Sequence, residues 1–340
     1  MTPVEQFDSI IRGKRTFTAL APMQDVTNLK FWRLMAEYGG PDVYFTEYFR
    51  VTDTSILYPE ILSSITENPT GMPVVAQMIG NDAEHLVRTA KDLQQHSIAA
   101  VDLNLGCPAP VVYRKCAGGG LLRDPARVDR ILGALRDAVG IRFTVKTRIG
   151  FDDPAVFDEM LRIFAKHSLD LLTVHGRTVK EMYRSEVHYD YIAKAVGAMG
   201  CPVVANGNVY SPENAEAIRK ETRAAGWMIG RGAIRNPWLF HQLRQHQNGE
   251  RVFEPTGHDV LAYIRKLYLT VTDDDVAENL RVQRIKKYLN FMGVGVDEEG
   301  QFLHRMRRAQ TEVDLFGICD DFFDHDNPMP LIPFPSKVGA

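Results

Sequence analysis

The stretch VDLNLGCPAP, residues 101–110, contains a short strand pattern and the point at which that strand must end. Apolar residues at 101, 103 and 105 alternate with polar residues at 102 and 104, which is the two-residue period of a β-strand. Gly106 and Pro108 interrupt this pattern. Cys107 is therefore expected just beyond the C-terminal end of a strand.

Similar β-rich segments recur along the chain, and amphipathic helical patterns separate them. The eight segments are FTALAPM from 17, VYFTEY from 43, PVVAQMI from 73, AVDLNLG from 100, FTVKTRI from 143, LLTVHGR from 171, PVVANGN from 202 and GWMIGRG from 226. The intervening patterns at 82–97, 124–139 and 211–225 each begin with Asp or Ser, which are good helix N-caps. Eight regular alternations predict the α/β class, as a (β/α)8 TIM barrel.

The pattern changes after Phe240, where helical periodicity continues without strands. The stretches 258–275, 276–292 and 298–316 are each expected to form one helix, and the acidic, proline-rich end is expected to be extended. The predicted domains are a barrel at 1–242, a C-terminal all-α helical domain at 243–320 and a tail at 321–340.

Composition narrows the class of protein. The chain has 340 residues, of which 24% are charged and 45% hydrophobic, and a net charge of −3. No apolar run reaches the roughly 18 to 20 residues of a membrane span, and the N-terminus lacks a signal-peptide pattern. Four scattered cysteines without CxxC or HExxH spacing predict neither a disulfide framework nor a metal site. We expect a cytoplasmic monomer, which would need a local basic patch to bind nucleic acid.

The C-terminal ends of barrel strands carry the chemistry of this fold, and here they are polar. Taken alone, a Gln or Asn at a strand end is more often a turn former than a ligand, but together these residues predict a pocket. Lys146 and Arg148 share one face of an otherwise apolar strand, so we expect a bound anion beside them. In strand order the end residues are Pro22, Met23 and Gln24; Glu47; Gln77; Asn104 and Cys107; Lys146 and Arg148; His175 and Arg177; Asn206, Gly207 and Asn208; Gly230 and Arg231.

The last two strands end in glycine turns, NGN and GRG, where barrels of this kind bind phosphate. Arg231 can add a bidentate contact to that phosphate. A ligand with one phosphate there and a head group that reaches Gln77, Lys146 and His175 fits flavin mononucleotide (FMN). His175 could instead be a hydrogen-bonded histidine of the barrel core. No GxGxxG motif follows the first strand, which disfavours a dinucleotide site.

Cys107 has a structural and a chemical interpretation. As an isolated cysteine it would be a small buried hydrophobe. At the rim, a thiol with an ordinary pKa of about 8.5 is mostly protonated at neutral pH and can act as a general acid. Hydride from a reduced flavin and a proton from the thiol would together reduce an activated double bond, such as C5=C6 of uracil.

The ordered motifs resemble the transfer RNA dihydrouridine synthase family over about residues 17 to 315. They are LAPMQDVTN, VAQMIGN, VDLNLGCPAPVVYRKCAGGGLLRDP, VKTRIGFDD, TVHGRTVKEMYRSEVHYDYI, VVANGNVYS and MIGRGAIRNPWLF. The resemblance implies an FMN-dependent enzyme that uses NADPH to reduce a D-loop uridine of tRNA. It makes Cys107 the proton donor and assigns FMN binding to Pro22, Met23, Gln24, Gln77, Lys146, His175, Asn206, Gly207, Asn208, Gly230 and Arg231.

Within this family, FTEYFRV and EMYRSEVHYDYI are most similar to the bacterial branch that modifies position 16. That similarity implies base or tRNA contacts for Arg50, Asn104 and Tyr183, the last by stacking on an extruded nucleotide. The resemblance also implies that the C-terminal helices grip tRNA, through basic residues that include Arg284, Lys286 and Arg307. Cys116 departs from the family pattern, which has a small residue there, and we interpret it as structural.

Two alternatives remain open. An FMN barrel that acts on a free pyrimidine, such as a dihydroorotate dehydrogenase, would not need the basic helices. A silent tRNA-binding module would not need Cys107 and Lys146, and it would purify without flavin.

Overall fold

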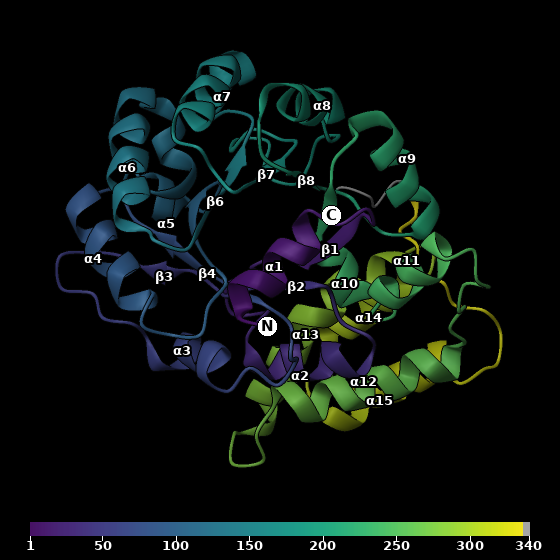
Figure 1. Ribbon diagram of the computed structural model, residues 1–340. Coiled ribbons are helices and arrows are strands. Elements are labelled where there is room, and N and C mark those ends of the chain that lie inside the picture. The colour runs from purple at the N-terminus through teal and green to yellow at the C-terminus, as the bar shows by residue number, and fades with distance from the viewer. Residues whose placement is uncertain (336–340) are drawn as a thin grey trace. The chain divides into compact units, whose positions relative to one another are not determined.

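The computed structural model of the protein describes residues 1–335 and contains a closed parallel barrel (Figure 1). Strand pairing runs in the order β2, β1, β9, β8, β7, β6, β5, β4, and a further pairing of β2 with β4 closes the ring of eight. The strands are β1 Phe17–Leu20, β2 Val43–Phe45, β3 Phe49–Arg50, β4 Val74–Ile79, β5 Ala100–Leu105, β6 Arg142–Arg148, β7 Leu171–His175, β8 Val203–Asn206 and β9 Gly226–Ile229.

The predicted (β/α)8 TIM barrel with C-terminal helices is therefore confirmed, and each of the eight predicted segments holds one barrel strand. The short strand β3 was not predicted. It follows β2 and pairs with the end of β4, with Phe49 opposite Met78.

Helices surround the barrel and form the C-terminal region. They are α1 Pro3–Ile11, α2 Leu29–Glu37, α3 Pro59–Thr66, α4 Ala83–Leu93, α5 Pro110–Tyr113, α6 Pro125–Ala138, α7 Phe157–Lys166, α8 Tyr189–Ala198, α9 Pro212–Thr222, α10 Arg231–Arg235, α11 Leu239–Gln247, α12 Gly257–Val271, α13 Glu278–Met292, α14 Gln301–Arg308 and α15 Glu312–Phe323. Three 3₁₀ helices are η1 Gly118–Arg123, η2 Pro154–Val156 and η3 Gly293–Gly295.

The predicted caps start two of the barrel helices. Asp82 accepts a hydrogen bond from the N–H of His85 at 3.0 Å, and Asp124 accepts one from the N–H of Arg127 at 3.0 Å. Each carboxylate satisfies one backbone donor that the first turn of a helix leaves free. The helix starts are therefore encoded locally, at the junctions that follow β4 and η1.

Strand register places the polar residues of neighbouring strands side by side. Gln77 on β4 pairs with Asp102 on β5, and Asn104 on β5 pairs with Lys146 on β6. His175 on β7 pairs with Arg148 on β6 and with Asn206 on β8. The polar residues of β4 to β8 thus lie side by side along one part of the barrel rim.

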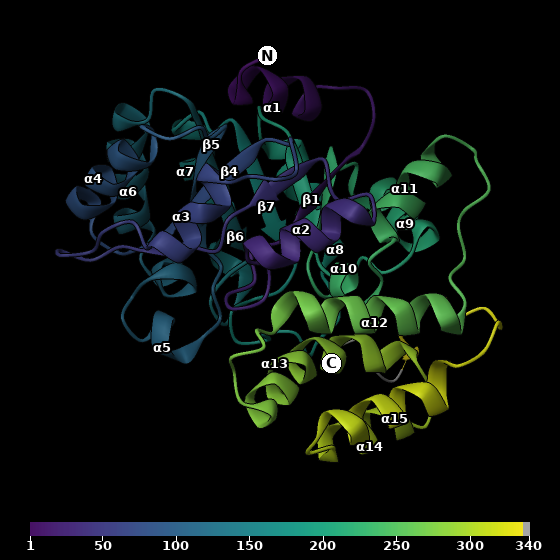
Figure 2. The same ribbon diagram turned by 90° about the horizontal axis from the view of Figure 1, so that it is seen from below.

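The opposite end of the barrel is apolar and is covered by α1 (Figure 2). Phe7 and Ile11 of this helix join a buried cluster with Phe17, Phe45 and other strand residues. The sequence interpretation did not include α1, although Thr2, Pro3 and Glu5 form a complete capping box with proline in the first turn. Because α1 covers this end, the polar rim lies at the other end of the barrel.

Contacts divide the chain into two compact units. The first holds residues 1–29, 41–209 and 215–229, and the second holds 30–40, 210–214 and 230–340. The second unit thus includes residues before the predicted boundary at 242/243. The division into a barrel domain, a helical domain and a tail stays a prediction. Helix α15 includes residues 321–323 of the predicted tail, while 336–340 of that tail lie outside the described residues.

The second unit contains α12, α13, α14 and α15, packed on one another (Figure 2). The single helix predicted over 298–316 is wrong: the structure has α14 and α15 there, separated at Ala309–Thr311. Thr311 ends the continuity because its side chain accepts from the N–H of Asp314 and caps a new helix. Across residues 1–335, no helix is both long enough and apolar enough to span a membrane.

Candidate active site

Cys107 lies in the loop that follows β5, and Asn104 shapes that loop. The Asn104 side-chain oxygen Oδ1 accepts hydrogen bonds from the N–H groups of Gly106 and Cys107, both at 2.9 Å. A short polar side chain thus replaces the strand ladder at the point where the strand stops. The position of the Cys107 backbone therefore depends on the orientation of the Asn104 amide.

The glycine run after Cys107 packs directly on it. The N–H of Gly119 in η1 donates to the carbonyl oxygen of Cys107 at 3.3 Å. A Cβ on Gly119 would lie 2.9 Å from that oxygen, and one on Gly118 would lie 3.0 Å from the Cβ of Cys107. Only glycine permits this close approach, which explains the GGG motif in physical terms.

The thiol of Cys107 is partly buried, and its environment keeps it protonated. Burial raises the pKa of Cys107 above its ordinary value, although Arg148, Lys146 and Arg50 nearby lower it. A raised pKa keeps the proton on sulfur at neutral pH. The group is therefore suited to donate a proton and is not activated as a nucleophile.

Lys146 lies at the end of β6, close to Cys107. Its Nζ donates to Oδ1 of Asn206 at 3.0 Å, and the amide nitrogen of Asn206 in turn donates to the carbonyl of Met228. Burial and the like charge of Arg148 lower the pKa of Lys146 to about 8, while Asp102 opposes this shift. The ammonium has a neutral hydrogen-bond acceptor, so an anionic group placed beside it would be stabilised.

Arg148 is buried and is held by backbone carbonyls. It donates to the carbonyl oxygens of Gly106 at 2.9 Å, Thr178 at 2.8 Å and Met182 at 2.7 Å. The expectation that this charge needs a bound anion is therefore wrong, because three carbonyl dipoles already solvate the guanidinium. The expectation of an anion remains for Lys146.

Tyr183 lies in the loop after β7 and is 39% exposed. Its ring is 6.1 Å from the His175 ring, edge to face, and the Arg148 guanidinium lies 5.2 Å from its centroid. The fully buried Arg177 binds the carbonyl of Ser185 in the same loop through Nε, at 2.8 Å. An aromatic ring is thus presented at the rim on a loop that two arginines hold.

Glu181 fixes the same loop from within. It accepts from the N–H of Thr178 at 2.6 Å and pairs with His188 at 2.8 Å. Burial would raise the pKa of Glu181, but the bonds from His188, Thr178 and Ser185 outweigh it and bring the pKa to about 2. The sequence analysis missed this residue, because loop contacts of this kind leave no periodic signal.

A buried network joins β4, β5 and β6 beneath the rim. Asp102 accepts from Gln77 and from Thr144, and Gln77 accepts from Asn104. The sequence analysis assigned Gln77 and Asn104 to the site but not Asp102. The signal was present in the opening stretch, since Asp102 and Asn104 fall on the same face of one strand.

The remaining predicted site residues of the first unit lie in loops after β1, β2 and β8, except Arg50, which ends the short strand β3. Pro22 and Met23 are partly buried, whereas Gln24 and Arg50 are exposed. Glu47 accepts from the N–H of Val26 at 3.1 Å and so fixes the loop that carries Met23. Positive φ angles at Gly207, 133°, and Asn208, 50°, turn the chain sharply at the end of β8.

In the second unit, Gly230 directly precedes α10, and Arg231 is the first residue of that helix.

The three tRNA contacts predicted in the second unit are on α13 and α14. Arg284 pairs with Asp273 at 3.3 Å, and Arg307 donates to Asn290 at 2.7 Å. Lys286 Nζ donates to the carbonyl of Arg307 at 3.1 Å and to that of Ala309.

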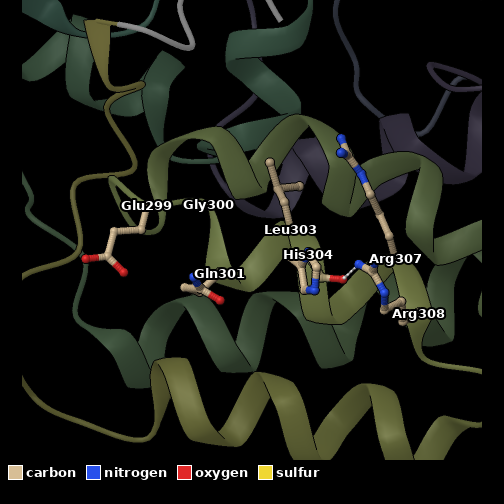
Figure 3. A pocket seen from close by; sticks show the side chains of 7 residues that line it. All are labelled: Glu299, Gly300, Gln301, Leu303, His304, Arg307 and Arg308. Atoms are coloured by element: carbon tan, nitrogen blue, oxygen red, sulfur yellow. Dashed lines mark hydrogen bonds between the residues drawn. The ribbon is translucent and has the colours of Figure 1, made fainter.

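A pocket of ≈ 430 Å³ lies along α14, where His304, Arg307 and Arg308 line it (Figure 3). Glu299, Gly300, Gln301 and Leu303 complete its wall. Within it, Arg308 donates to the carbonyl oxygen of His304 at 2.9 Å. The wall of this pocket on α14 therefore carries two arginines and one glutamate.

The fold and the polar rim define a (β/α)8-barrel enzyme, and comparison with known proteins identifies its family. The family model described as Dihydrouridine synthase (Dus) matches residues 19–310. The chain belongs to the dihydrouridine synthase family and is an oxidoreductase of that family.

Similarity to individual proteins agrees with this assignment. The tRNA-dihydrouridine(16) synthase of Neisseria meningitidis serogroup A is 28% identical over 317 residues, which are 91% of this chain and 95% of that protein. The protein of the same name from Ralstonia nicotianae is 31% identical over 313 residues, 88% of this chain and 94% of the relative. A solved structure, 6-hydroxypseudooxynicotine amine oxidase from Pseudomonas geniculata, has a TM-score of 0.53 at 13% identity, covers 77% of this chain and 53% of that chain, and shares the fold alone.

Proposed function

We propose that the protein reduces the C5=C6 bond of uridine 16 in the D-loop of tRNA, with bound FMN, with NADPH as reductant and with Cys107 as proton donor. The observation that carries this proposal is the placement of the partly buried Cys107 thiol in the loop after β5, close to the ammonium of Lys146 on β6. Two relatives that align over about nine tenths of this chain are tRNA-dihydrouridine(16) synthases, which supports the position.

The residues at the rim fit FMN by the chemistry of their donors. Lys146 offers an ammonium whose hydrogen-bond acceptor is a neutral amide, which suits the anionic edge of a reduced flavin ring. Gln77 and His175 would contact the same ring, and Pro22, Met23 and Gln24 would line it. Asn206, Gly207, Asn208, Gly230 and Arg231 would hold the remainder of the cofactor, including its phosphate.

When bound, FMN would supply hydride to C6 of the uracil ring. Cys107 then gives its proton to C5, because its pKa lies above neutrality and the proton is still on sulfur. Asn104 holds the Cys107 backbone and faces the base. Lys146, whose pKa of about 8 leaves it mainly charged at neutral pH, would place a positive charge beside the reacting groups.

Tyr183 and the basic helices bind the substrate. The uridine must leave its stack to enter a barrel, and Tyr183 offers an exposed ring for it to stack on. Arg50, Arg284 and Arg307 contribute positive charge toward the tRNA backbone. Lys286 acts through α14, since its ammonium is bonded to carbonyls at the end of that helix.

We further propose that the protein acts as a monomer in the cytoplasm and uses no metal. The substrate would be a folded tRNA, which a single chain with one barrel and one helical region is large enough to hold. Size-exclusion chromatography with light scattering measures the mass of the free protein and of its tRNA complex.

The proposed function is tested by deleting the gene and mapping dihydrouridine in the host's tRNA position by position. We expect loss at position 16, full restoration by the wild type and by Cys116→Ala, and no restoration by Cys107→Ala. Cys116 is the matched control because it is an exposed cysteine of the same segment. Rescue by Cys107→Ala would remove the proton-donor role, and loss at another position would remove the assignment to uridine 16.

A further inference from the structure

Asp102 is a completely buried carboxylate on β5, two residues before Asn104, and the chemistry at the rim leaves it without a role. Its strand neighbours in register are Gln77 on β4 and Thr144 on β6. A buried carboxylate is costly unless every oxygen is hydrogen-bonded. Its partners therefore indicate what it does.

Both carboxylate oxygens of Asp102 have short hydrogen bonds. Thr144 Oγ1 donates to Oδ1 at 2.6 Å, and Gln77 Nε2 donates to Oδ2 at 2.8 Å. Burial raises the pKa of Asp102 to about 6, although these two bonds and the charge of Lys146 lower it. At neutral pH the group is therefore mainly ionised and accepts hydrogen bonds only.

An acceptor-only group fixes the orientation of the amide beside it. Because Asp102 can only accept, Gln77 must turn its NH₂ toward Asp102 and its oxygen away. That oxygen accepts from the NH₂ of Asn104 at 2.8 Å. The oxygen of Asn104 then points to the N–H groups of Gly106 and Cys107, each at 2.9 Å.

In this series of hydrogen bonds, one amide cannot be turned around without breaking the bonds on both of its sides. Turning the Gln77 amide would put two oxygens together at Asp102 and two NH₂ groups together at Asn104. Leaving such buried groups unsatisfied costs on the order of 1–3 kcal/mol each. One carboxylate thus sets two amide orientations.

We propose that Asp102 is a positioning residue that fixes the amides of Gln77 and Asn104 and, through them, the backbone that holds the Cys107 thiol. The role rests on the proposed function, in which Cys107 donates the proton.

Two variants separate orientation from charge. Asp102→Ala removes the acceptor, so the Gln77 NH₂ loses its partner and the amide is held only from the Asn104 side. Asp102→Asn removes the charge but keeps an oxygen for Gln77, because its NH₂ can donate to the hydroxyl of Thr144, and Asn104, whose oxygen is held by the N–H groups of Gly106 and Cys107, keeps the Gln77 amide from turning. If orientation matters, only the alanine variant is defective.

Asp42 provides the matched control for the loss of a buried carboxylate. It is 6% exposed, lies just before β2 and accepts from the N–H and the hydroxyl of Thr18 at 2.8 and 2.9 Å. Its partners are Thr18 and Arg15, and neither is a rim residue. Asp42→Ala should therefore lower stability without changing the chemistry at Cys107.

The first measurement is a single turnover of the FMN-loaded proteins. We expect tRNA to reoxidise the reduced Asp102→Ala protein about 10- to 100-fold more slowly than wild type, because small displacements of a reacting group cost this much. Reduction by NADPH should slow less than the tRNA-dependent step, and Asp102→Asn and Asp42→Ala should stay within about threefold of wild type in both steps. Equal defects in Asp102→Asn and Asp102→Ala would assign the effect to charge and overturn the proposal.

The second measurement does not require tRNA and keeps the proposal testable if the proposed function fails. Alkylation of Cys107 by iodoacetamide is followed by peptide mass spectrometry at several pH values, with exposed Cys116 as internal reference. We expect Asp102→Ala and Gln77→Leu to change the Cys107 rate severalfold, and the double variant to add nothing further. Unchanged alkylation in a folded Asp102→Ala protein, or additive effects, would overturn the positioning role.

Discussion

The guanidinium of Arg148 lies 5.2 Å from the ring centroid of Tyr183 and also donates to the carbonyl of Gly106, next to Cys107. Two further bonds reach Thr178 and Met182 in the loop that carries Tyr183. One side chain therefore ties the loop of the proposed proton donor to the loop of the proposed stacking residue.

Replacement of Arg148 by lysine should loosen both loops. A lysine lacks the planar fork that reaches three carbonyls, and each hydrogen bond to a charged group contributes about 1.5–3 kcal/mol. We expect Arg148→Lys to lower the free energy of unfolding by about 3 kcal/mol and to raise the KM for tRNA about tenfold. Urea denaturation and steady-state kinetics measure the two effects.

The control for this variant is Arg219→Lys. Arg219 lies on the surface of α9 and pairs with Glu216 at 2.7 Å, a contact that lysine can also make. Its effect on stability should stay within about 0.5 kcal/mol. An Arg148→Lys protein as stable as the control would contradict the role assigned to the carbonyl bonds.

Gly119→Ala tests the close packing on Cys107. Its Cβ would lie 2.4 Å from Cγ2 of Val179 and 2.9 Å from the carbonyl oxygen of Cys107, so the backbone must move. We expect a loss of about 1–3 kcal/mol in the free energy of unfolding and a slower tRNA-dependent step.

Glycine to alanine at Gly197 should change the free energy of unfolding in the opposite direction. Gly197 lies within α8, and a Cβ there meets nothing within 4 Å. Alanine is the better helix former by up to about 1 kcal/mol, so Gly197→Ala should stabilise the protein. Similar losses in both alanine variants would show that packing against Cys107 does not decide the result.

The barrel could be predicted from the sequence because its signals are local. Period-two apolar runs that end in glycine or proline mark the strands, and Asp82 and Asp124 mark helix starts. The break between α14 and α15 was missed because apolar residues continue at helical spacing through Ala309, although Thr311 carries a capping signal. The sequence analysis followed the helical spacing of apolar residues and did not use Thr311 as a helix start.

The site could be predicted only as a set of residues at strand ends. Which of them touch depends on strand register, and the sequence does not specify that Gln77 lies opposite Asp102. The bonds from Arg148 to Thr178 and Met182 depend on a loop conformation that has no periodic signature. Contacts between strands and loops therefore had to come from the structure.

Glu47 should make stability depend on pH. Burial raises its pKa from the ordinary 4.5 to about 7, and the nearby charge of Asp25 adds to the shift. Between these values the folded protein keeps a proton that the unfolded chain has released, so the free energy of unfolding falls as pH rises from about 4.5 to about 7. The fall amounts to at most about 3 kcal/mol.

Glu47→Gln removes this titration and keeps an oxygen for the N–H of Val26. We expect the variant to be more stable than wild type at pH 8 and equal to it near pH 4.5, by urea denaturation across that range. Glu60→Gln, on the exposed start of α3, should leave the profile unchanged. Parallel profiles for wild type and Glu47→Gln would refute the raised pKa.

Neighbouring lysines on α13 separate a structural role from contact with tRNA. Lys286 Nζ is bonded to carbonyls at the C-terminal end of α14, where a positive charge is also favourable, whereas Lys287 is exposed. Lys286→Ala should lower the free energy of unfolding by about 1–2 kcal/mol, and Lys287→Ala should leave it within about 0.5 kcal/mol of the wild-type value.

The salt dependence of tRNA binding tests the same two lysines. When a lysine that contacts phosphate is removed, the slope of log affinity against log salt concentration falls by about 1. In filter-binding titrations we expect this reduced slope for Lys287→Ala and an unchanged slope for Lys286→Ala. A reduced slope in a fully stable Lys286→Ala protein would instead make Lys286 a direct tRNA contact.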